Sequence, residues 1–481
     1  MQKKFFSNLF FIILLNLLIK PLYVFGIDIQ VQNIVGSEDY GLYFSLLNFS
    51  FLLNMFLDIG VTNYNTKNTA QNPKMLTKYI GSFFGLKIML GILYALISIG
   101  FALFLGYSDK EMYLLSFFVL NQILVGLILY IRSNFAGMHM FKVDAILSVL
   151  DRLLLIIISA FLIYGHWTES RFKIEWFIYA QTFAYGATLI IGLLLTRAKI
   201  GKIRIQANKV LSLAILRKST PFAILILLMM LYTRMDAVML ERMLPNGKEQ
   251  SGIYAQGFRL LDAINMFAFL VAGLLLPIFS RLIGESSPVK PILQMAGKFL
   301  IGVSIVAAVG LALNSELTID SIYINNTDES ANVFFWLILC FIPLSFSHVF
   351  GTLLTANNNL RLLNQMAIFG VILNICLNLI LIPRMEAQGA AIATVITQSV
   401  TALLQLFLVM RVFKFSIDWN SVSRLGIFIV IYVPMTYLMS SYFHQIWSLI
   451  TTFGIGFTML VLLKLVHFQD LLALLKSKTE N

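Results

Sequence analysis

The feature that most constrains this chain is a succession of apolar runs, each about twenty residues long. A helix of that length crosses the hydrocarbon core of a bilayer while satisfying all of its own backbone hydrogen bonds. The runs begin near Ser7, Tyr40, Ile80, Met112, Ala145, Glu175, Pro221, Ile253, Gly297, Asn332, Met366, Gly389, Arg424 and Ile446. The sequence therefore predicts an all-α integral membrane protein with about fourteen transmembrane helices.

The composition agrees with a membrane environment. Hydrophobic residues make up 59% of the 481 residues and charged residues only 12%, about half the charged share of a soluble globular chain. A net charge of +12 would suggest nucleic acid as the partner of a soluble protein. Here no aromatic–basic motif and no soluble domain is found, so we predict no nucleic-acid binding.

The distribution of charge over the loops predicts an orientation. The loop over residues 197–218 carries many Lys and Arg and no acid, whereas the loop over residues 314–330 carries Asp and Glu and no base. Cytoplasmic loops of membrane proteins collect Lys and Arg. We therefore predict that the first loop is cytoplasmic, the second external, and both termini cytoplasmic.

An internal repeat relates two distant segments. Residues 38–43 (EDYGLY) match residues 249–254 (EQSGIY), and residues 54–56 (NMF) are identical with residues 265–267. If each repeat contains six helices, the chain returns to its starting side of the membrane after each one. The repeat then predicts two parallel six-helix lobes related by an axis along the membrane normal, which is an arrangement typical of alternating-access transporters.

The repeat also predicts the domain boundaries. We assign residues 1–218 to an N-terminal six-helix lobe and residues 219–411 to a C-terminal six-helix lobe. Residues 412–481 remain as two additional transmembrane helices and a cytoplasmic tail. The loops between the predicted helices are too short for an extramembrane domain to fold.

Basic residues inside the predicted helices are the main candidates for a site. A Lys or Arg at mid-bilayer costs about 2.5–3.5 kcal/mol on insertion scales, so such residues face a cavity or pair with acids. The candidates are Lys20, Lys87, Arg152, Arg234 and Arg259. Because Lys and Arg both bind phosphate groups, we predict that these residues contact an anionic substrate.

Nearby acids leave a second interpretation open. Asp236 follows Arg234 by two residues, and Asp262 lies at i+3 from Arg259, on the same helix face. These pairs could be structural neutralisation only. Alternatively, Asp236 and Asp262 could couple transport to a cation.

No signature of an enzyme or of a cofactor site is found. The five His are scattered without metal-ligand spacing, and Cys340 and Cys376 lie inside apolar runs. The chain has no phosphate-binding Gly–Lys loop, no HExxH and no nucleophile elbow. We therefore predict a transporter without catalytic residues, cofactor or metal.

Several motifs together carry a family resemblance. They are residues 34–43 (IVGSEDYGLY), 58–60 (DIG), 232–236 (YTRMD), 252–254 (GIY), 381–383 (LIP) and 388–394 (QGAAIAT). With them the chain resembles the polysaccharide-biosynthesis flippases, which are O-antigen and lipid-linked oligosaccharide translocases. This family belongs to the multidrug/oligosaccharidyl-lipid/polysaccharide export superfamily. Its members are similar in having two six-helix lobes around a cationic cavity.

The resemblance implies a function. It implies movement of a polyprenyl-pyrophosphate-linked oligosaccharide, such as an O-antigen unit of lipopolysaccharide, across the cell inner membrane. It also implies polysaccharide polymerase or assembly proteins as partners. Three alternatives stay open, namely a multidrug or cation antiporter of the same superfamily, a lipid II flippase, and a membrane glycosyltransferase. The short loops count against the last, and the bases in the helices against a site for cationic drugs.

Overall fold

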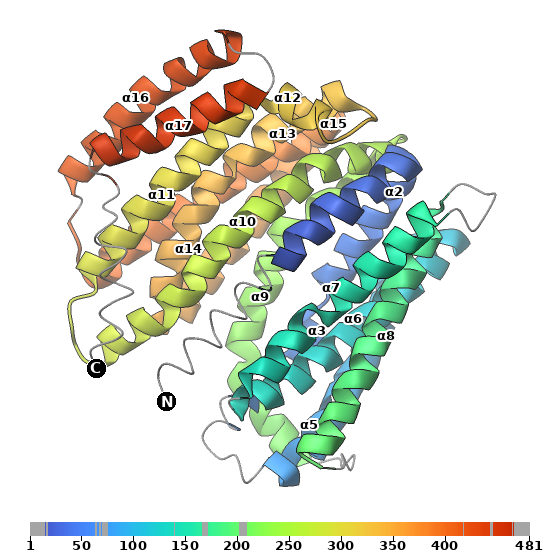
Figure 1. Cartoon of the computed structure of the whole chain (residues 1–481). Coiled ribbons are helices and arrows are strands. Elements are labelled where there is room, and N and C mark those ends of the chain that lie inside the picture. Colours follow the sequence, from blue (N-terminus) through green and yellow to red (C-terminus); the bar gives the residue numbers. More distant parts are fainter. Residues whose placement is uncertain are drawn as a thin grey trace. The chain divides into compact units, whose positions relative to one another are not determined.

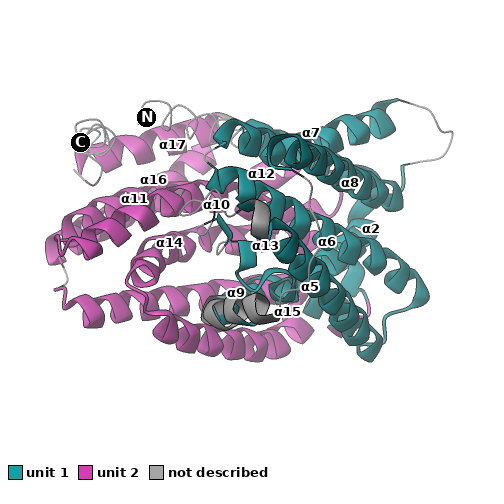
Figure 2. Cartoon of the chain, turned by 90° about the horizontal axis from the view of Figure 1, so that it is seen from below, with its two compact units in different colours: residues 1–242, 246–252 teal, residues 243–245, 253–481 magenta. Residues whose placement is uncertain are grey.

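The fold was analysed in a computed structural model. It describes residues 15, 18–62, 65–66, 69, 76–138, 140–165, 172–201, 209–416, 418–442, 446–463 and 465. Within these residues the regular structure is helical, and no strand occurs. The chain divides into two compact units, which Figure 2 shows in different colours, and each is described by itself.

Unit 1 comprises residues 1–242 and 246–252. Its helices are η1 (Val24–Asp28), α2 (Ile29–Leu52), α3 (Met55–Asp58), α5 (Leu76–Phe104), α6 (Asp109–Gly137), α7 (Phe141–Tyr164), α8 (Ile174–Lys199) and α9 (Lys209–Met243). Helix α6 packs against α2, α5, α7 and α8 (Figure 1). Its apolar face contributes Tyr130, Ile131 and Phe135 to a core shared with α5.

Unit 2 comprises residues 243–245 and 253–481. Its helices are α10 (Gly247–Gly284, whose first residues belong to unit 1), α11 (Lys290–Ala312), α12 (Ser315–Asp320), α13 (Thr327–Leu339), α14 (Phe341–Ala356), α15 (Leu360–Phe413), α16 (Trp419–Tyr442) and α17 (Ile446–Leu462). Helices α16 and α17 lie side by side and pack on α11 (Figure 1). There the hydroxyl of Tyr432 donates to the Val306 carbonyl at 3.1 Å.

The helices correspond to the predicted segments. Among the described residues, ten helices are long and apolar enough to cross a membrane. Helix α15 has 54 residues, too many for one crossing, and non-helical backbone at Glu386 (φ 50°, ψ −132°) divides it in two. Gly36 (φ 82°) divides α2 in the same way. The predicted all-α membrane fold with about fourteen crossings is confirmed, although the beginning of the first segment, at Ser7, lies outside the described residues.

The repeated sequence motif marks a close helix crossing within unit 1. A Cβ on Gly41 would collide with the Lys248 carbonyl oxygen, and a Cβ on Gly252 would collide with the Ser37 carbonyl oxygen. Gly41 thus meets Lys248, which lies four positions before Gly252. In the same way Gly252 meets Ser37, which lies four positions before Gly41. The side chain of Gln32 also donates to the Gly252 carbonyl at 2.9 Å. Only glycine allows the two backbones to approach so closely.

Ion pairs hold the start of α10 against α6. Glu111 closes the capping box of α6 by accepting from the Ser108 backbone N–H at 2.9 Å. The same carboxylate pairs with Arg242 at 2.9 Å and with Lys248 at 3.0 Å. These contacts and the glycine crossing explain why residues 246–252 pack in unit 1 while the rest of α10 belongs to unit 2.

The tyrosines of the repeat make corresponding contacts in their own units. In unit 1 the Tyr43 hydroxyl accepts from the Gln181 amide of α8 at 2.7 Å. In unit 2 the Tyr254 hydroxyl lies 3.4 Å from the Thr394 hydroxyl of α15. In both units the partner belongs to the sixth crossing of the predicted lobe. The compact units are defined by packing and the lobes by the repeat, so the predicted lobe boundaries stay a prediction.

Candidate functional site

Three basic side chains gather in unit 1, and we call them the cation group: Lys20, Arg132 and Arg152. Lys20 precedes η1, Arg132 lies on α6, and Arg152 lies on α7. Both guanidinium charges act on the Lys20 ammonium. The sequence predicted Lys20 and Arg152 as site residues, and the fold brings them together.

Acidic side chains neutralise the cation group only in part. Arg132 pairs with Asp144 at 2.8 Å, and Arg152 lies 3.8 Å from Asp151. Asp28, a third acid, is buried beside Tyr23, so acids and bases are equal in number here. Among the described residues, however, Lys20 forms no ion pair within 4 Å. A lysine ammonium inside a membrane protein is costly unless an anion approaches it.

Tyrosines surround the Arg152 guanidinium. Its carbon lies 4.7 Å from the centre of the Tyr23 ring and 6.0 Å from that of Tyr185, within the range of cation–π contacts. The Tyr23 hydroxyl donates to Asp28 at 3.4 Å, and the Tyr40 hydroxyl donates to the same carboxylate at 2.9 Å. Asp28 is buried and fixes the ring on which Arg152 rests.

This arrangement can bind an anionic group next to a polar, ring-shaped one. An Arg guanidinium presents a planar fork of N–H donors that matches phosphate oxygens, and a Lys ammonium adds a compact charge. Tyrosine rings offer apolar faces with polar edges. Phosphate and sugar together match the group better than an apolar cation would.

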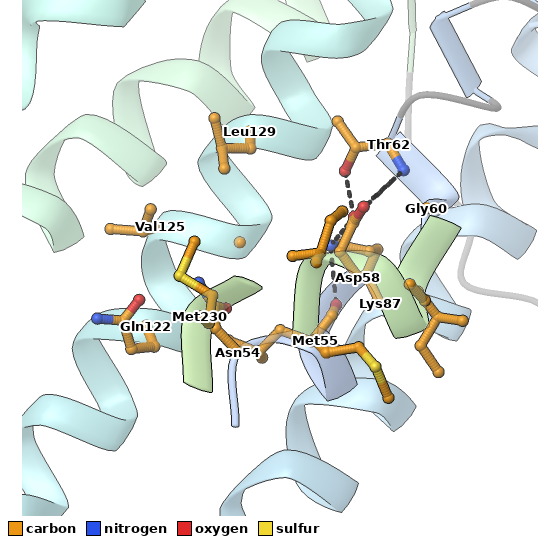
Figure 3. A pocket seen from close by; sticks show the side chains of 15 residues that line it. Asn54, Met55, Asp58, Gly60, Thr62, Lys87, Gln122, Val125, Leu129 and Met230 are labelled. Carbon is orange, nitrogen blue, oxygen red and sulfur yellow. Dashed lines mark hydrogen bonds and ion pairs between the residues drawn. The ribbon is translucent and has the colours of Figure 1, made fainter. Parts of the chain in front are cut away.

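Lys87 is a predicted site residue that lies apart from the cation group. Its ammonium pairs with Asp58 at 2.6 Å and donates to the Leu57 carbonyl at 2.9 Å. The pair lies beside a pocket of about 300 Å³ that α3, α5, α6 and α9 line (Figure 3). Unlike the cation group, this lysine already has a full counter-charge within the chain.

Arg234 and Asp236 lie on α9. The Arg234 guanidinium reaches the Asn48 side-chain oxygen at 3.5 Å and rests 5.5 Å from the centre of the Phe51 ring. Asp236 is buried, at 1% exposure. The structure therefore places Arg234 against α2, while the predicted ion-coupling role of Asp236 stays a prediction.

Arg259 and Asp262 belong to unit 2. Both are half-buried side chains on α10, one turn apart. Their predicted roles in substrate contact and ion coupling stay predictions. Over the described residues, no group of three or more His, Cys, Asp or Glu side chains is placed to hold a metal ion.

Sequence reasoning missed two residues of this region. Arg132 lies near the end of a predicted segment, so it counted as a loop residue, and only the packing of α6 on α7 brings it to the group. Asp28 is an acid inside the first apolar segment. The rule that flagged buried bases applies equally to buried acids, so Asp28 could have been found.

Comparison with protein-family models establishes the family. Residues 5–283, more than half of the chain, match the model of the polysaccharide biosynthesis proteins. The chain belongs to this family. A comparison with curated proteins gave no match.

Solved structures share the fold. The lipid II flippase MurJ in an inward closed conformation is 17% identical with a TM-score of 0.71, and the match covers 97% of this chain and 99% of that one. An inward-facing multidrug transporter of the MATE family is 14% identical with a TM-score of 0.63, covering 81% and 94%. A MOP superfamily transporter from Pyrococcus furiosus, described by the reverse polarity of its binding pocket, is 14% identical with a TM-score of 0.62, covering 85% and 96%.

The family and the fold together fix the class of protein. This polysaccharide biosynthesis protein is a multi-pass membrane transporter of the multidrug/oligosaccharidyl-lipid/polysaccharide export superfamily. The identities are low, so the solved structures bear on its fold alone. The substrate has to be argued from the residues of this chain.

Proposed function

We propose that this protein is a flippase that moves a polyprenyl-pyrophosphate-linked oligosaccharide across the cytoplasmic membrane by alternating access. The observation that carries the proposal is Lys20, which forms no ion pair within 4 Å in the part of the chain that the structure describes, in a region where Arg132 and Arg152 each have an acid nearby. A pyrophosphate entering the membrane loses its hydration, which costs several kcal/mol per ion unless charges of opposite sign replace the water. Lys20 and Arg152 would supply those charges.

The rest of the substrate suits the same region. The glycan would lie against Tyr23 and Tyr185, and the polyprenyl tail would stay in lipid, which solvates it at no cost. The glycan would be an O-antigen unit or another surface polysaccharide repeat. We further propose that both termini are cytoplasmic, that the protein lies in the inner membrane, and that polysaccharide polymerase or assembly proteins act with it.

Lys87 is left out of the proposed substrate contacts because Asp58 already neutralises its ammonium. Arg234 and Arg259 remain proposed contacts. Arg234 contacts the Asn48 side chain and the Phe51 ring. Its proposed role rests on the ability of a guanidinium inside a predicted membrane helix to bind phosphate oxygens.

The test is complementation of a strain that lacks this protein. Wild type should restore surface glycan, and a Lys20→Ala/Arg152→Ala variant that inserts normally should not. Arg281→Ala is the matched control, because Arg281 is exposed and, among the described residues, pairs only with Glu285 one turn away. Normal surface glycan in the deletion strain, with a gain of sensitivity to cationic drugs, would favour the antiporter alternative.

Two other outcomes separate the remaining alternatives. A block in cell-wall synthesis with intact surface glycan would favour lipid II as the substrate, because that molecule offers the same pyrophosphate chemistry. Formation of a new glycosidic bond by the purified protein would favour a glycosyltransferase. Accumulation of the lipid-linked oligosaccharide inside the deletion strain is the result that the flippase proposal expects.

A further inference from the structure

The pocket beside Lys87 has a polar end and an apolar wall. Its polar lining consists of Asn54, Asp58, Thr62, Lys87 and Gln122, and its apolar lining includes Val125, Leu129 and Met230 (Figure 3). A volume of about 300 Å³ holds several water molecules, each of which occupies about 30 Å³ in the liquid. The polar end can therefore be hydrated within a membrane-crossing unit.

A break in the backbone creates the polar end. Helix α2 stops at Leu52, the short helix α3 ends at Asp58, and the next two residues are left-handed, Ile59 at φ 42° and Gly60 at φ 77°. Left-handed backbone is rare for a β-branched residue such as Ile. Irregular backbone at membrane depth is tolerated where it lines a water-filled cavity, and the carboxyl ends of broken helices bind cations there.

The Lys87 ammonium occupies the position of a bound cation. Among the described residues its two ligands are a carboxylate, Asp58 Oδ1 at 2.6 Å, and a carbonyl near the end of α3, Leu57 O at 2.9 Å. Both are hard oxygen ligands of the kind that small cations prefer. The lysine is thus a cation tethered to the protein by its own side chain.

The two partners differ in access to the pocket. The Lys87 side chain is 2% exposed, whereas the Asp58 side chain is 35% exposed. Asp58 Oδ1 accepts from the Lys87 ammonium and from the Thr62 hydroxyl. Within the described part of the chain, Oδ2 is contacted only by the Thr62 backbone N–H, at 3.4 Å. A second cation can therefore reach Asp58 through Oδ2 without first displacing Lys87.

We propose that Asp58 is a cation-exchange site, at which a small monovalent cation from the pocket, a proton or Na⁺, replaces the ammonium of Lys87. The cation leaves pocket water and binds Oδ2, and for a proton a new O–H bond forms there. The ion pair then separates, and the ammonium keeps its three protons and moves toward the pocket. The return of the cation to water restores the pair, so charge and protons balance.

The surroundings allow this exchange. Gly126 of α6 presents no side chain to the ammonium, and even an added Cβ there would lie 3.9 Å from Lys87 Nζ. Among the described residues that line the pocket, Asp58 and Lys87 are the ionisable ones. Within this described lining the exchange therefore has no competing charge.

The exchange gives the proposed flippase a means of coupling, and in that respect it rests on the proposed function. A cation whose binding separates the pair would stabilise the conformation in which α3 and α5 are released from each other. The shift is limited by the difference in cation affinity between the two conformations. Cation binding itself needs no substrate, so it can be tested separately.

Infrared difference spectroscopy on the purified full-length protein in lipid nanodiscs tests the site. One series varies pH from about 4 to 9, and another exchanges choline for Na⁺ at constant pH. We expect a carboxylic-acid band that appears with acid, or a carboxylate band that shifts with Na⁺. The two series distinguish the proton from the metal ion. Asp58→Asn should abolish that signal completely.

Asp418 supplies the matched control. Its side chain is 36% exposed. Like Asp58 it accepts from a nearby hydroxyl, here that of Ser421, and it lies near a lysine, Lys298, at 3.7 Å. The Ser421 hydroxyl, assisted by the Ser421 backbone N–H and Lys298, holds the pKa of Asp418 below its usual range against the opposing effect of burial. Asp418→Asn should leave the Asp58 signal unchanged.

A second variant distinguishes loss of the cation site from misfolding of the protein. Because Asp58→Asn leaves a buried lysine without its counter-charge, Asp58→Asn/Lys87→Met is examined in parallel, and it should lack the signal in a folded protein. A wild-type spectrum with no Asp58-dependent change in either series would overturn the cation-exchange site. That result would leave the flippase proposal intact, since complementation by Lys20 and Arg152 variants does not depend on it.

Discussion

The two charged regions of unit 1 differ in how they stabilise basic side chains inside a membrane protein. In the cation group Arg132 and Arg152 each have an acid nearby, whereas Lys20 forms no ion pair within 4 Å among the described residues. The Asp58–Lys87 pair matches one base with one acid, and the base is almost fully covered by protein. A lysine without a paired acid can take an anion from outside the chain, whereas a matched pair already has its partner and can act only by exchanging it.

Both charged regions depend on the fold of unit 1. A variant that disrupts this fold therefore sets the upper limit of the expected effects. Gly41→Ala should give the largest effect, since its Cβ would collide with the backbone carbonyl of Lys248, which has no freedom to move away. We expect little or no folded protein after membrane extraction, measured by size-exclusion chromatography. Gly100→Ala is the control, because a Cβ there meets nothing within 4 Å. Equal yields of the two variants would contradict the glycine crossing.

Removing the Lys20 and Arg152 charges should abolish transport without unfolding the protein. In Lys20→Ala/Arg152→Ala two charge-assisted contacts are lost, each worth about 1.5–3 kcal/mol. Surface glycan in the complemented strain should therefore fall by at least about a hundredfold, while yield stays near that of wild type. The measurement is quantitative glycan labelling normalised to the amount of inserted protein. Retained glycan would mean that the cation group does not bind substrate.

Breaking the Asp58–Lys87 pair should instead lower the stability of the protein. Asp58→Asn strands the covered ammonium of Lys87 and should lower the free energy of unfolding by about 3–5 kcal/mol. Lys87→Met should cost less, because Asp58 is already partly exposed to the pocket. The double variant should recover most of the loss, which denaturant unfolding in mild detergent can measure. Additive single effects would show that the two residues are not coupled.

A conservative change, Arg152→Lys, should have the smallest effect of these variants. Arg152→Lys keeps the charge but loses the planar fork that binds phosphate bidentately and stacks on Tyr23. Transport should fall by about tenfold, the equivalent of 1.4 kcal/mol, while the double alanine variant loses far more. Kinetics of glycan appearance in the complemented strain measure the difference. Full activity of Arg152→Lys would show that charge alone suffices.

The sequence predicted the crossings well because each apolar run carries its own signal of length. Boundaries were harder, since they depend on contacts: α10 begins at Gly247 because the glycine crossing and Glu111 extend the helix beyond the predicted start at Ile253. The breaks at Gly36 and Glu386 fall between predicted segments, but nothing in the sequence showed that helix would continue up to them on both sides.

Only the individual residues of the candidate site could be predicted from the sequence. Buried bases could be recognised singly, but their grouping depends on the packing of α6, α7 and the residues before η1, which sequence spacing does not reveal. Lys20 thus joined Arg152 and the unexpected Arg132, whereas Lys87 joined Asp58. Whether a base serves a ligand or an internal partner is decided by tertiary contacts, and local sequence carries no record of them.

The most direct test of the central claim is transport by the purified protein in sealed vesicles. A polyprenyl-pyrophosphate-linked oligosaccharide is placed in both leaflets, and its exposure to an external glycan-modifying enzyme is followed over time. Wild type should make the inner-leaflet fraction accessible, and Lys20→Ala/Arg152→Ala should leave it protected while Arg281→Ala behaves as wild type. If the double variant matched wild type, or if wild type matched protein-free vesicles, the assignment of a lipid-linked pyrophosphate to the cation group would be wrong.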